Sequence, residues 1–390
     1  MKLAARMENL GTETAFLVLA RARQLESEGR DIVHLEIGEP DFDTPANIVA
    51  AGAEALSGGY THYGPAPGLP ELRKAVADEV GRSRGVDVSP EEVVILPGGK
   101  PVMSFLMLAV LEEGCEAVYP NPGFPIYESM INFLGARAVP LPIREENDFN
   151  VDVGELQGLL GEETRLLILN SPGNPCGGVL SRSDVDRIAE AVRPYPDLWI
   201  LSDEVYSRII YEGEHHSLLS YPEIRDRVVV LDGFSKTYAM TGWRLGYGIM
   251  HKDMAERIAQ LQTNVTSCTA SFTQMAGIEA LRGPQEDAAK MVAEFRKRRQ
   301  VIVEGLNALP GVSCKTPKGA FYVFPSFKEI GISSRKLEQM LLDEAGVACL
   351  TGTSFGALGE GYLRFSYANS VENIQEALRR IDKLLTAVEK

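Results

Sequence analysis

Short apolar runs separated by helix-like stretches occupy the middle of the chain and restrict the folds open to it. Six such runs, each bounded by turn-forming residues, lie at 93–96, 116–119, 166–170, 198–202, 228–231 and 245–250. Continuous apolar runs are typical of parallel strands, which are buried on both faces. Helical stretches between them indicate βαβ units. The sequence therefore predicts an α/β fold with a mostly parallel sheet covered by helices.

The segments on either side of this region indicate a second, smaller part of mixed structure. A long charged helical stretch at 285–308 follows Gly283-Pro284, and short strands and helices alternate beyond it. The 390 residues are enough for two domains. We expect a large domain at 46–285 and a smaller α+β domain built from residues 286–390, which the N-terminal segment 1–45 joins.

Charge and cysteine usage exclude several classes of partner and site. The formal net charge of −15 argues against nucleic acid or an anionic membrane as a partner. The five cysteines are odd in number and widely spaced, which favours reduced thiols in the cytoplasm over disulfides or a metal site. The first residues lack the apolar region of a signal peptide. The apolar run at 103–111 is too short to cross a bilayer.

Residues able to bind a ligand follow the predicted strands directly. In an open parallel sheet, ligands bind outside the carboxyl ends of the strands. The residues at these ends, in chain order, are Gly98, Gly99, Lys100, Phe124, Asn174, Asp203, Tyr206, Ser235 and Lys236. Each of them, taken singly, could equally be a turn or core residue. Their common position at one sheet edge predicts a single binding site.

Lys236 indicates which ligand this site takes. An amine at the end of a buried strand loses hydration, which lowers its pKa, and a neutral amine can form a Schiff base with a carbonyl. Ser235 beside it and Arg244 eight residues later suit a phosphate. An aldehyde and a phosphate together describe pyridoxal 5′-phosphate. The alternative is a lysine that only ends a strand.

Eight motifs in order resemble a known family along almost the whole chain. They are Gly-Glu-Pro-Asp-Phe-Asp-Thr-Pro at 38–45, Tyr63 with Gly-Leu-Pro-Glu-Leu-Arg at 68–73, Gly-Gly-Lys at 98–100, Asn-Ser-Pro-Gly-Asn-Pro at 170–175, Ser-Asp-Glu-Val-Tyr at 202–206, Ser-Lys at 235–236, Met-Thr-Gly-Trp-Arg at 240–244 and Leu-Arg-Phe-Ser-Tyr-Ala at 363–368. The chain resembles a class I/II aminotransferase of the pyridoxal-phosphate-dependent fold-type-I superfamily. It is most similar to the bacterial and archaeal aspartate aminotransferase subgroup. The resemblance implies a mostly parallel seven-stranded sheet.

The resemblance also implies a role for each matching residue at the cofactor. Lys236 is similar to the lysine that forms the Schiff base and moves the proton, and Asp203 to the partner of the pyridine nitrogen. Tyr206 and Asn174 match the residues that bond the ring oxygen. The remaining matches are Phe124, which would stack on the ring, and Gly98, Gly99, Lys100, Ser235 and Arg244, which would surround the phosphate.

The same resemblance extends to the substrate and the assembly. Arg364 is similar to the arginine that binds the substrate α-carboxylate, with Gly38 and Asn174 beside that group. Tyr63 is similar to a tyrosine that reaches the phosphate of a neighbouring subunit, which implies a homodimer with shared active sites. The implied reaction is ping-pong transfer of an amino group between an L-amino acid and a 2-oxo acid.

Substrate preference and reaction type stay open at this point. Lys100 favours aspartate or glutamate, whereas Phe16, Leu17 and Phe124 suit an apolar or aromatic side chain. A pyridoxal-phosphate-dependent C–S β-lyase on the same fold is the alternative activity. A regulator's effector domain would need a basic helix-turn-helix segment that the N-terminal residues do not provide. A nucleotide-binding protein would need a Gly-x-Gly-x-x-Gly turn, which does not follow any of the strands.

Overall fold

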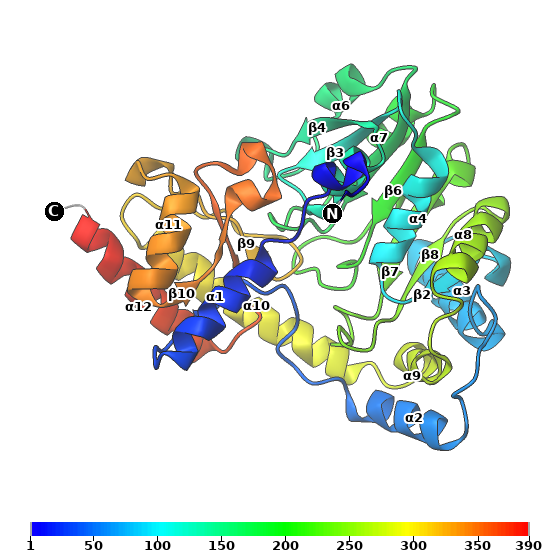
Figure 1. The fold of residues 1–390 in the computed structure, drawn as a ribbon, viewed down its shortest axis with the longest axis horizontal. Coiled ribbons are helices and arrows are strands. Elements are labelled where there is room, and N and C mark those ends of the chain that lie inside the picture. Colours follow the sequence, from blue (N-terminus) through cyan, green and yellow to red (C-terminus); the bar gives the residue numbers. More distant parts are fainter. Residues whose placement is uncertain (1, 389–390) are drawn as a thin grey trace.

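A seven-stranded sheet forms the centre of the computed structural model, which describes residues 2–388 (Figure 1). The strands are β2 (Val93–Leu96), β3 (Glu116–Asn121), β4 (Arg137–Pro142), β5 (Thr164–Asn170), β6 (Trp199–Asp203), β7 (Val228–Gly233) and β8 (Gly246–Ile249). Their order is β2-β8-β7-β6-β5-β3-β4. Strand β8 runs antiparallel to the other six strands, which are parallel to one another. The predicted α/β fold with a mostly parallel sheet is confirmed.

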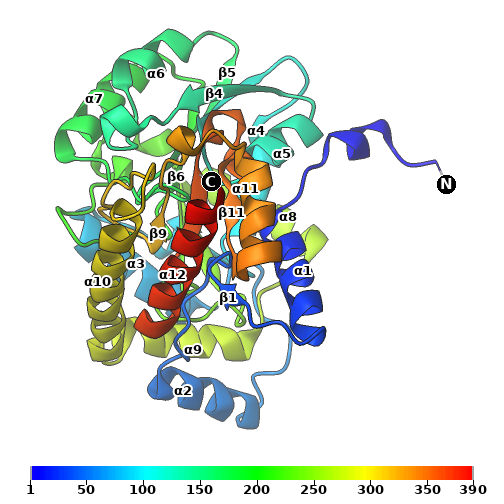
Figure 2. The same ribbon diagram turned by 90° about the vertical axis from the view of Figure 1, so that its left-hand side faces the viewer.

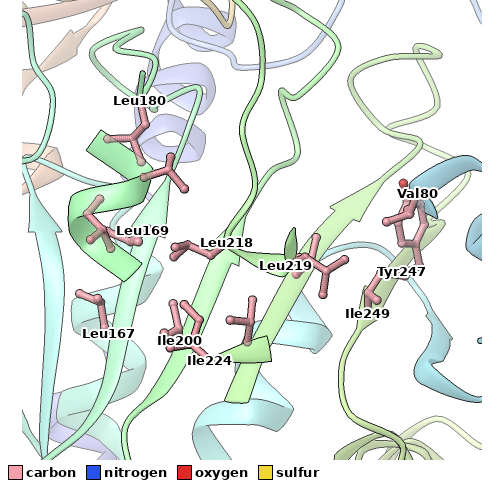
Figure 3. Close-up of a cluster of buried hydrophobic side chains, with 14 of the residues drawn as sticks. Val80, Leu167, Leu169, Leu180, Ile200, Leu218, Leu219, Ile224, Tyr247 and Ile249 are labelled. Carbon is pink, nitrogen blue, oxygen red and sulfur yellow. The ribbon is translucent and has the colours of Figure 1, made fainter. Parts of the chain in front are cut away.

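Helices cover both faces of this sheet because the strands are apolar on both sides. The helices are α2 (Ala46–Ser57), α3 (Pro70–Arg84), α4 (Lys100–Val110), α5 (Ile126–Phe133), α6 (Val153–Leu159), α7 (Arg182–Val192), α8 (Lys252–Val265) and α9 (Ser271–Arg282). Along β2, Val93 and Ile95 belong to the core shared with α2, α3, α7 and α9, while Val94 and Leu96 belong to the core shared with α4, α5 and α8. Figure 3 shows part of the first core, where Leu167, Leu169 and Ile200 of β5 and β6 point towards Leu218 and Ile224.

Strand β4 was not among the apolar runs read from the sequence. It contains Pro140 and Pro142, which lack the N–H that a central strand must donate. In the structure β4 is an edge strand and pairs only with β3, so both prolines are tolerated there.

A second group of elements combines the two ends of the chain. Its members are α1 (Ala15–Ser27), β1 (Val33–His34), α10 (Glu286–Asn307), β9 (Tyr322–Val323), α11 (Ser334–Met340), β10 (Val347–Ala348), β11 (Leu350–Thr351), β12 (Leu363–Ser366) and α12 (Val371–Val388). Strand β1 pairs with β10 in parallel, and β11, β12 and β9 form an antiparallel sheet. Helices α10 and α12 pack against each other on the outer side (Figure 2).

No helix in residues 2–388 is both long enough and apolar enough to cross a membrane. Near the N-terminus, a 3-10 turn at Ala5–Asn9 has no buried residue and stands away from α1 (Figure 2).

Candidate active site

A cavity of 860 Å³ lies at the carboxyl ends of the central strands, against the second group of elements. The predicted site residues in its walls are Gly38, Gly99, Lys100, Phe124, Asn174, Asp203, Tyr206, Ser235, Lys236, Arg244 and Arg364. They come from segments as distant as the loop after β1 and strand β12, so only the tertiary fold brings them together. Two predicted residues do not line the cavity: Gly98, which directly precedes Gly99 in the chain, and Tyr63.

Lys236 carries the amine of the cavity, three residues after β7. Its Nζ donates a hydrogen bond of 2.5 Å to the carbonyl oxygen of Gly38. Burial lowers the pKa of Lys236 to about 8, although the nearby Glu39 carboxylate opposes this effect. An appreciable fraction of this amine is therefore neutral near neutral pH and able to act as a nucleophile or base.

Asp203, the last residue of β6, is a buried carboxylate. Its Oδ2 accepts a hydrogen bond of 2.5 Å from the hydroxyl of Tyr127, and its Oδ1 accepts one of 3.3 Å from the N–H of Val205. Burial raises the pKa of Asp203 to about 6, while the Tyr127 hydrogen bond opposes this effect. A buried carboxylate of this kind suits a cationic ligand group such as a protonated pyridine nitrogen.

Tyr206 and Tyr322 place a pair of phenols beside these charges. Their hydroxyl oxygens are 2.8 Å apart, and burial raises the pKa of Tyr206 well above its ordinary value, so the hydroxyl stays protonated. Tyr322 also explains Gly38, because a Cβ on that residue would lie 2.3 Å from the Tyr322 hydroxyl. No motif in the sequence marks Tyr322 as part of the site.

Arg364, in strand β12, is buried in the wall of the cavity. Its Nη1 donates a 3.2 Å hydrogen bond to Asn174 Oδ1, and its Nη2 donates to the carbonyl oxygen of Glu36. The guanidinium lies between the rings of Tyr322 and Phe355, at 4.5 and 4.9 Å from their centroids. Its Nε is buried without a hydrogen-bond partner in the described residues. Nη1 and Nη2 each carry a second N–H, and a guanidinium of this kind in a cavity wall is fit to bind a carboxylate.

Gly98, the first of two glycines before α4, packs closely against the side chain of Arg244, and we call this contact the corner at Gly98. Gly98 has a φ of +95°, and a Cβ there would lie 2.3 Å from Arg244 Nη2. The Arg244 Nη1 donates a hydrogen bond of 2.8 Å to the carbonyl oxygen of Thr241. Backbone N–H groups at the start of a helix, together with a guanidinium and the hydroxyl of Ser235, suit a phosphate.

Lys100 and Tyr63 have surroundings that differ from those of the other predicted residues. Lys100 forms an ion pair of 2.9 Å with Glu13, and its Nζ lies 5.5 Å from the ring centroid of Phe124. Tyr63, in the loop between α2 and α3, is 89% exposed in the single chain. It therefore makes no contribution to the cavity of its own chain.

These groups match the parts of pyridoxal phosphate one by one. Lys236 would supply the amine for its aldehyde, Asp203 the partner for its ring nitrogen, Phe124 a surface for its ring, and the corner at Gly98 the groups for its phosphate. The Arg364 guanidinium would remain for the carboxylate of an amino acid. The residues present thus fit this cofactor and an amino-acid substrate.

Comparison with known proteins decides the family. The model of the family "Aminotransferase class I and II" matches residues 30–381. The chain belongs to the class I and II aminotransferases. It is 41% identical to an aspartate aminotransferase of Pyrococcus horikoshii, over 92% of each chain. It is 37% identical to aromatic-amino-acid aminotransferase 2 of Thermococcus litoralis, over 99% of this chain and 98% of the relative.

The solved structures of aminotransferases agree with this result. The structure of aspartate aminotransferase from Thermus thermophilus with maleate superposes with a TM-score of 0.92 at 34% identity, over 98% of this chain and 100% of that one. This class I/II aminotransferase is therefore a pyridoxal-phosphate-dependent transaminase of fold type I. The relatives' names do not favour a C–S lyase.

Proposed function

We propose that this aminotransferase moves an amino group between an L-amino acid and a 2-oxo acid, using Lys236 as its catalytic base. One observation carries the proposal: the Lys236 amine, the Arg364 guanidinium and the Asp203 carboxylate line the same cavity. A base, an anchor for the substrate carboxylate and a partner for the cofactor ring are the groups that transamination requires.

The chain's own residues divide the work between binding and proton transfer. Bound pyridoxal phosphate supplies an aldehyde that receives the amino group and a ring that accepts electron density. Arg364 and Asn174 hold the α-carboxylate, and this orients the Cα–H bond towards Lys236. The neutral Lys236 amine, favoured by burial, takes and holds that proton. Asp203 would keep the ring nitrogen protonated, and Tyr206 would donate to the ring oxygen.

The assembly and location follow from the same proposal. We place Tyr63 at the phosphate of a second copy of this chain, because its side chain is exposed and does not line its own cavity. A homodimer with shared active sites is the result. The five cysteines form no disulfide, in keeping with a reducing cytoplasm. We also propose domain limits near residues 45 and 285, in keeping with the separate core of the second group of elements.

The substrate range includes aspartate and glutamate or extends to aromatic amino acids. Relatives named for aspartate and for aromatic amino acids support both possibilities. The direct test adds single amino acids to the purified holoenzyme and follows the visible absorption of the cofactor. Donors should change the absorption, and a 2-oxo acid should restore it. Pyruvate release without any 2-oxo acid acceptor would contradict the proposal and indicate a β-lyase.

A further inference from the structure

Lys100 already has a carboxylate partner inside the cavity. Glu13 Oε2 lies 2.9 Å from Lys100 Nζ, and both residues line the cavity. The Glu13 side chain is only 17% exposed, compared with 48% for Lys100. A distal carboxylate of a bound substrate would therefore have to compete with Glu13 for the lysine.

The segment that carries Glu13 is fixed on both sides. The N–H of Gly11 donates a hydrogen bond of 2.9 Å to Ser129 Oγ on α5. The hydroxyl of Thr14 donates one of 2.7 Å to Ser354 Oγ in the 3-10 turn Gly352–Phe355. These two contacts hold Glu13 over the cavity, two residues before α1 begins.

The charge of Glu13 also acts on the groups that bind and convert the substrate. Burial lowers the pKa of Lys236 and of Arg364, and in both cases the Glu13 carboxylate opposes the effect of burial. A second carboxylate on a substrate held by Arg364 would experience the same negative charge as repulsion.

An uncharged side chain would find a different environment. Phe16, Leu19 and Phe124 line the same cavity as the ion pair. Such a side chain can contact these apolar groups and leave the pair between Glu13 and Lys100 in place. A dicarboxylate, in contrast, must break the pair or accept the repulsion of Glu13.

We propose that Glu13 is a specificity-determining residue, which neutralises Lys100 and so favours amino acids with uncharged side chains over aspartate and glutamate. The inference rests on the proposed function of the same cavity. It assigns Glu13 an effect on the choice of substrate, not on the chemistry, which Lys236 performs.

The test compares L-phenylalanine and L-aspartate as donors to the holoenzyme, with cofactor absorption as the readout. The wild-type enzyme should have the higher kcat/KM with phenylalanine. Glu13→Gln should raise the aspartate-to-phenylalanine ratio of kcat/KM by roughly fivefold, since a partly exposed ion pair contributes on the order of 1 kcal/mol. The bound cofactor's absorption shows that the variant is folded.

Glu39→Gln is the matched control. Glu39 also lines the cavity and acts on the charge of Lys236, but its carboxylate accepts a 2.8 Å hydrogen bond from Thr241 and does not contact Lys100. The ratio should change little in this variant. A double-mutant cycle completes the design: in a Lys100→Met background, Glu13→Gln should no longer alter the ratio.

Three results would overturn the inference. The ratio could stay unchanged in Glu13→Gln, or rise equally in Glu39→Gln, or respond as strongly to Glu13→Gln without Lys100 as with it. In all three cases transamination itself would still be observed. A wild-type holoenzyme that reacts with no amino acid would instead contradict the proposed function, and this inference with it.

Discussion

The hydroxyl of Tyr127 donates a hydrogen bond of 2.5 Å to the buried carboxylate of Asp203. Burial raises the pKa of Asp203 to about 6, and this hydrogen bond opposes the increase. If ionised Asp203 holds the cofactor ring, cofactor affinity must fall as the pH falls through about 6, because the carboxylate then gains a proton.

Replacing Tyr127 should shift that pH dependence. In Tyr127→Phe the ionised form of Asp203 loses a donor, so its pKa rises and the midpoint of cofactor affinity moves to higher pH. Titration of the cofactor-free protein with pyridoxal phosphate between about pH 5 and pH 8 measures the midpoint. Tyr119→Phe removes another buried phenol, which has no contact with Asp203, and serves as control. Equal midpoints in all three proteins would contradict the assignment.

Arg364→Lys should weaken substrate binding severely. A lysine cannot reproduce the planar set of donors that joins Asn174, the Glu36 carbonyl and a carboxylate. Truncating one partner of a buried charged pair costs about 2–5 kcal/mol, so KM for the amino acid should rise at least roughly 30-fold. Steady-state kinetics check this result, with cofactor absorption as proof that the site is otherwise intact. An unchanged KM would exclude Arg364 from carboxylate binding.

Gly98→Ala should weaken cofactor binding through Arg244. The new Cβ would lie 2.3 Å from Arg244 Nη2, and the φ of +95° adds backbone strain. Gly135→Ala is the matched control, because its φ is +81° but no atom lies within 4 Å of the added Cβ. Both variants should lose about 1 kcal/mol of stability from the left-handed backbone. Only Gly98→Ala should also lose affinity for pyridoxal phosphate, and equal affinities would contradict the role of this corner.

Complementation tests whether Tyr63 serves a second copy of the chain. Lys236→Ala chains should be inactive, and Tyr63→Phe chains should bind the cofactor weakly. In a mixed dimer, the Tyr63→Phe chain retains Lys236 and receives Tyr63 from the other chain, so one complete site is restored. Mixing the two variants after dissociation should therefore recover activity at low cofactor concentration. Activity no higher than that of Tyr63→Phe alone would contradict a shared site.

The sequence was most informative where chemistry and strand ends coincide. Lys236, Asp203 and Arg364 follow or lie within strands, and the structure brings all three to one cavity. Helices α2 and α12 show the local signal of a buried face, because their apolar residues recur at helical spacing. Strand β1 is limited to Val33–His34, since its pairing with β10 covers only two residues.

The residues that the sequence did not reveal act through contacts between distant segments. Tyr322 meets Tyr206 across 116 positions of the chain, and Glu13 meets Lys100 across 87. Neither Tyr322 nor Glu13 lies at the end of a strand of the central sheet, so no local signal marks it as part of the site. Tyr127 is a buried residue near the start of α5. Its place in the helix does not indicate that it contacts Asp203.

Reduction of the holoenzyme with borohydride tests the central claim most directly, because it fixes the cofactor to the amine that binds its aldehyde. Peptide mass analysis should then find the pyridoxyl group on Lys236, and not on Lys100, the other lysine of the cavity. A protein that carries no adduct after incubation with pyridoxal phosphate, or that carries it on a lysine other than Lys236, would contradict the account.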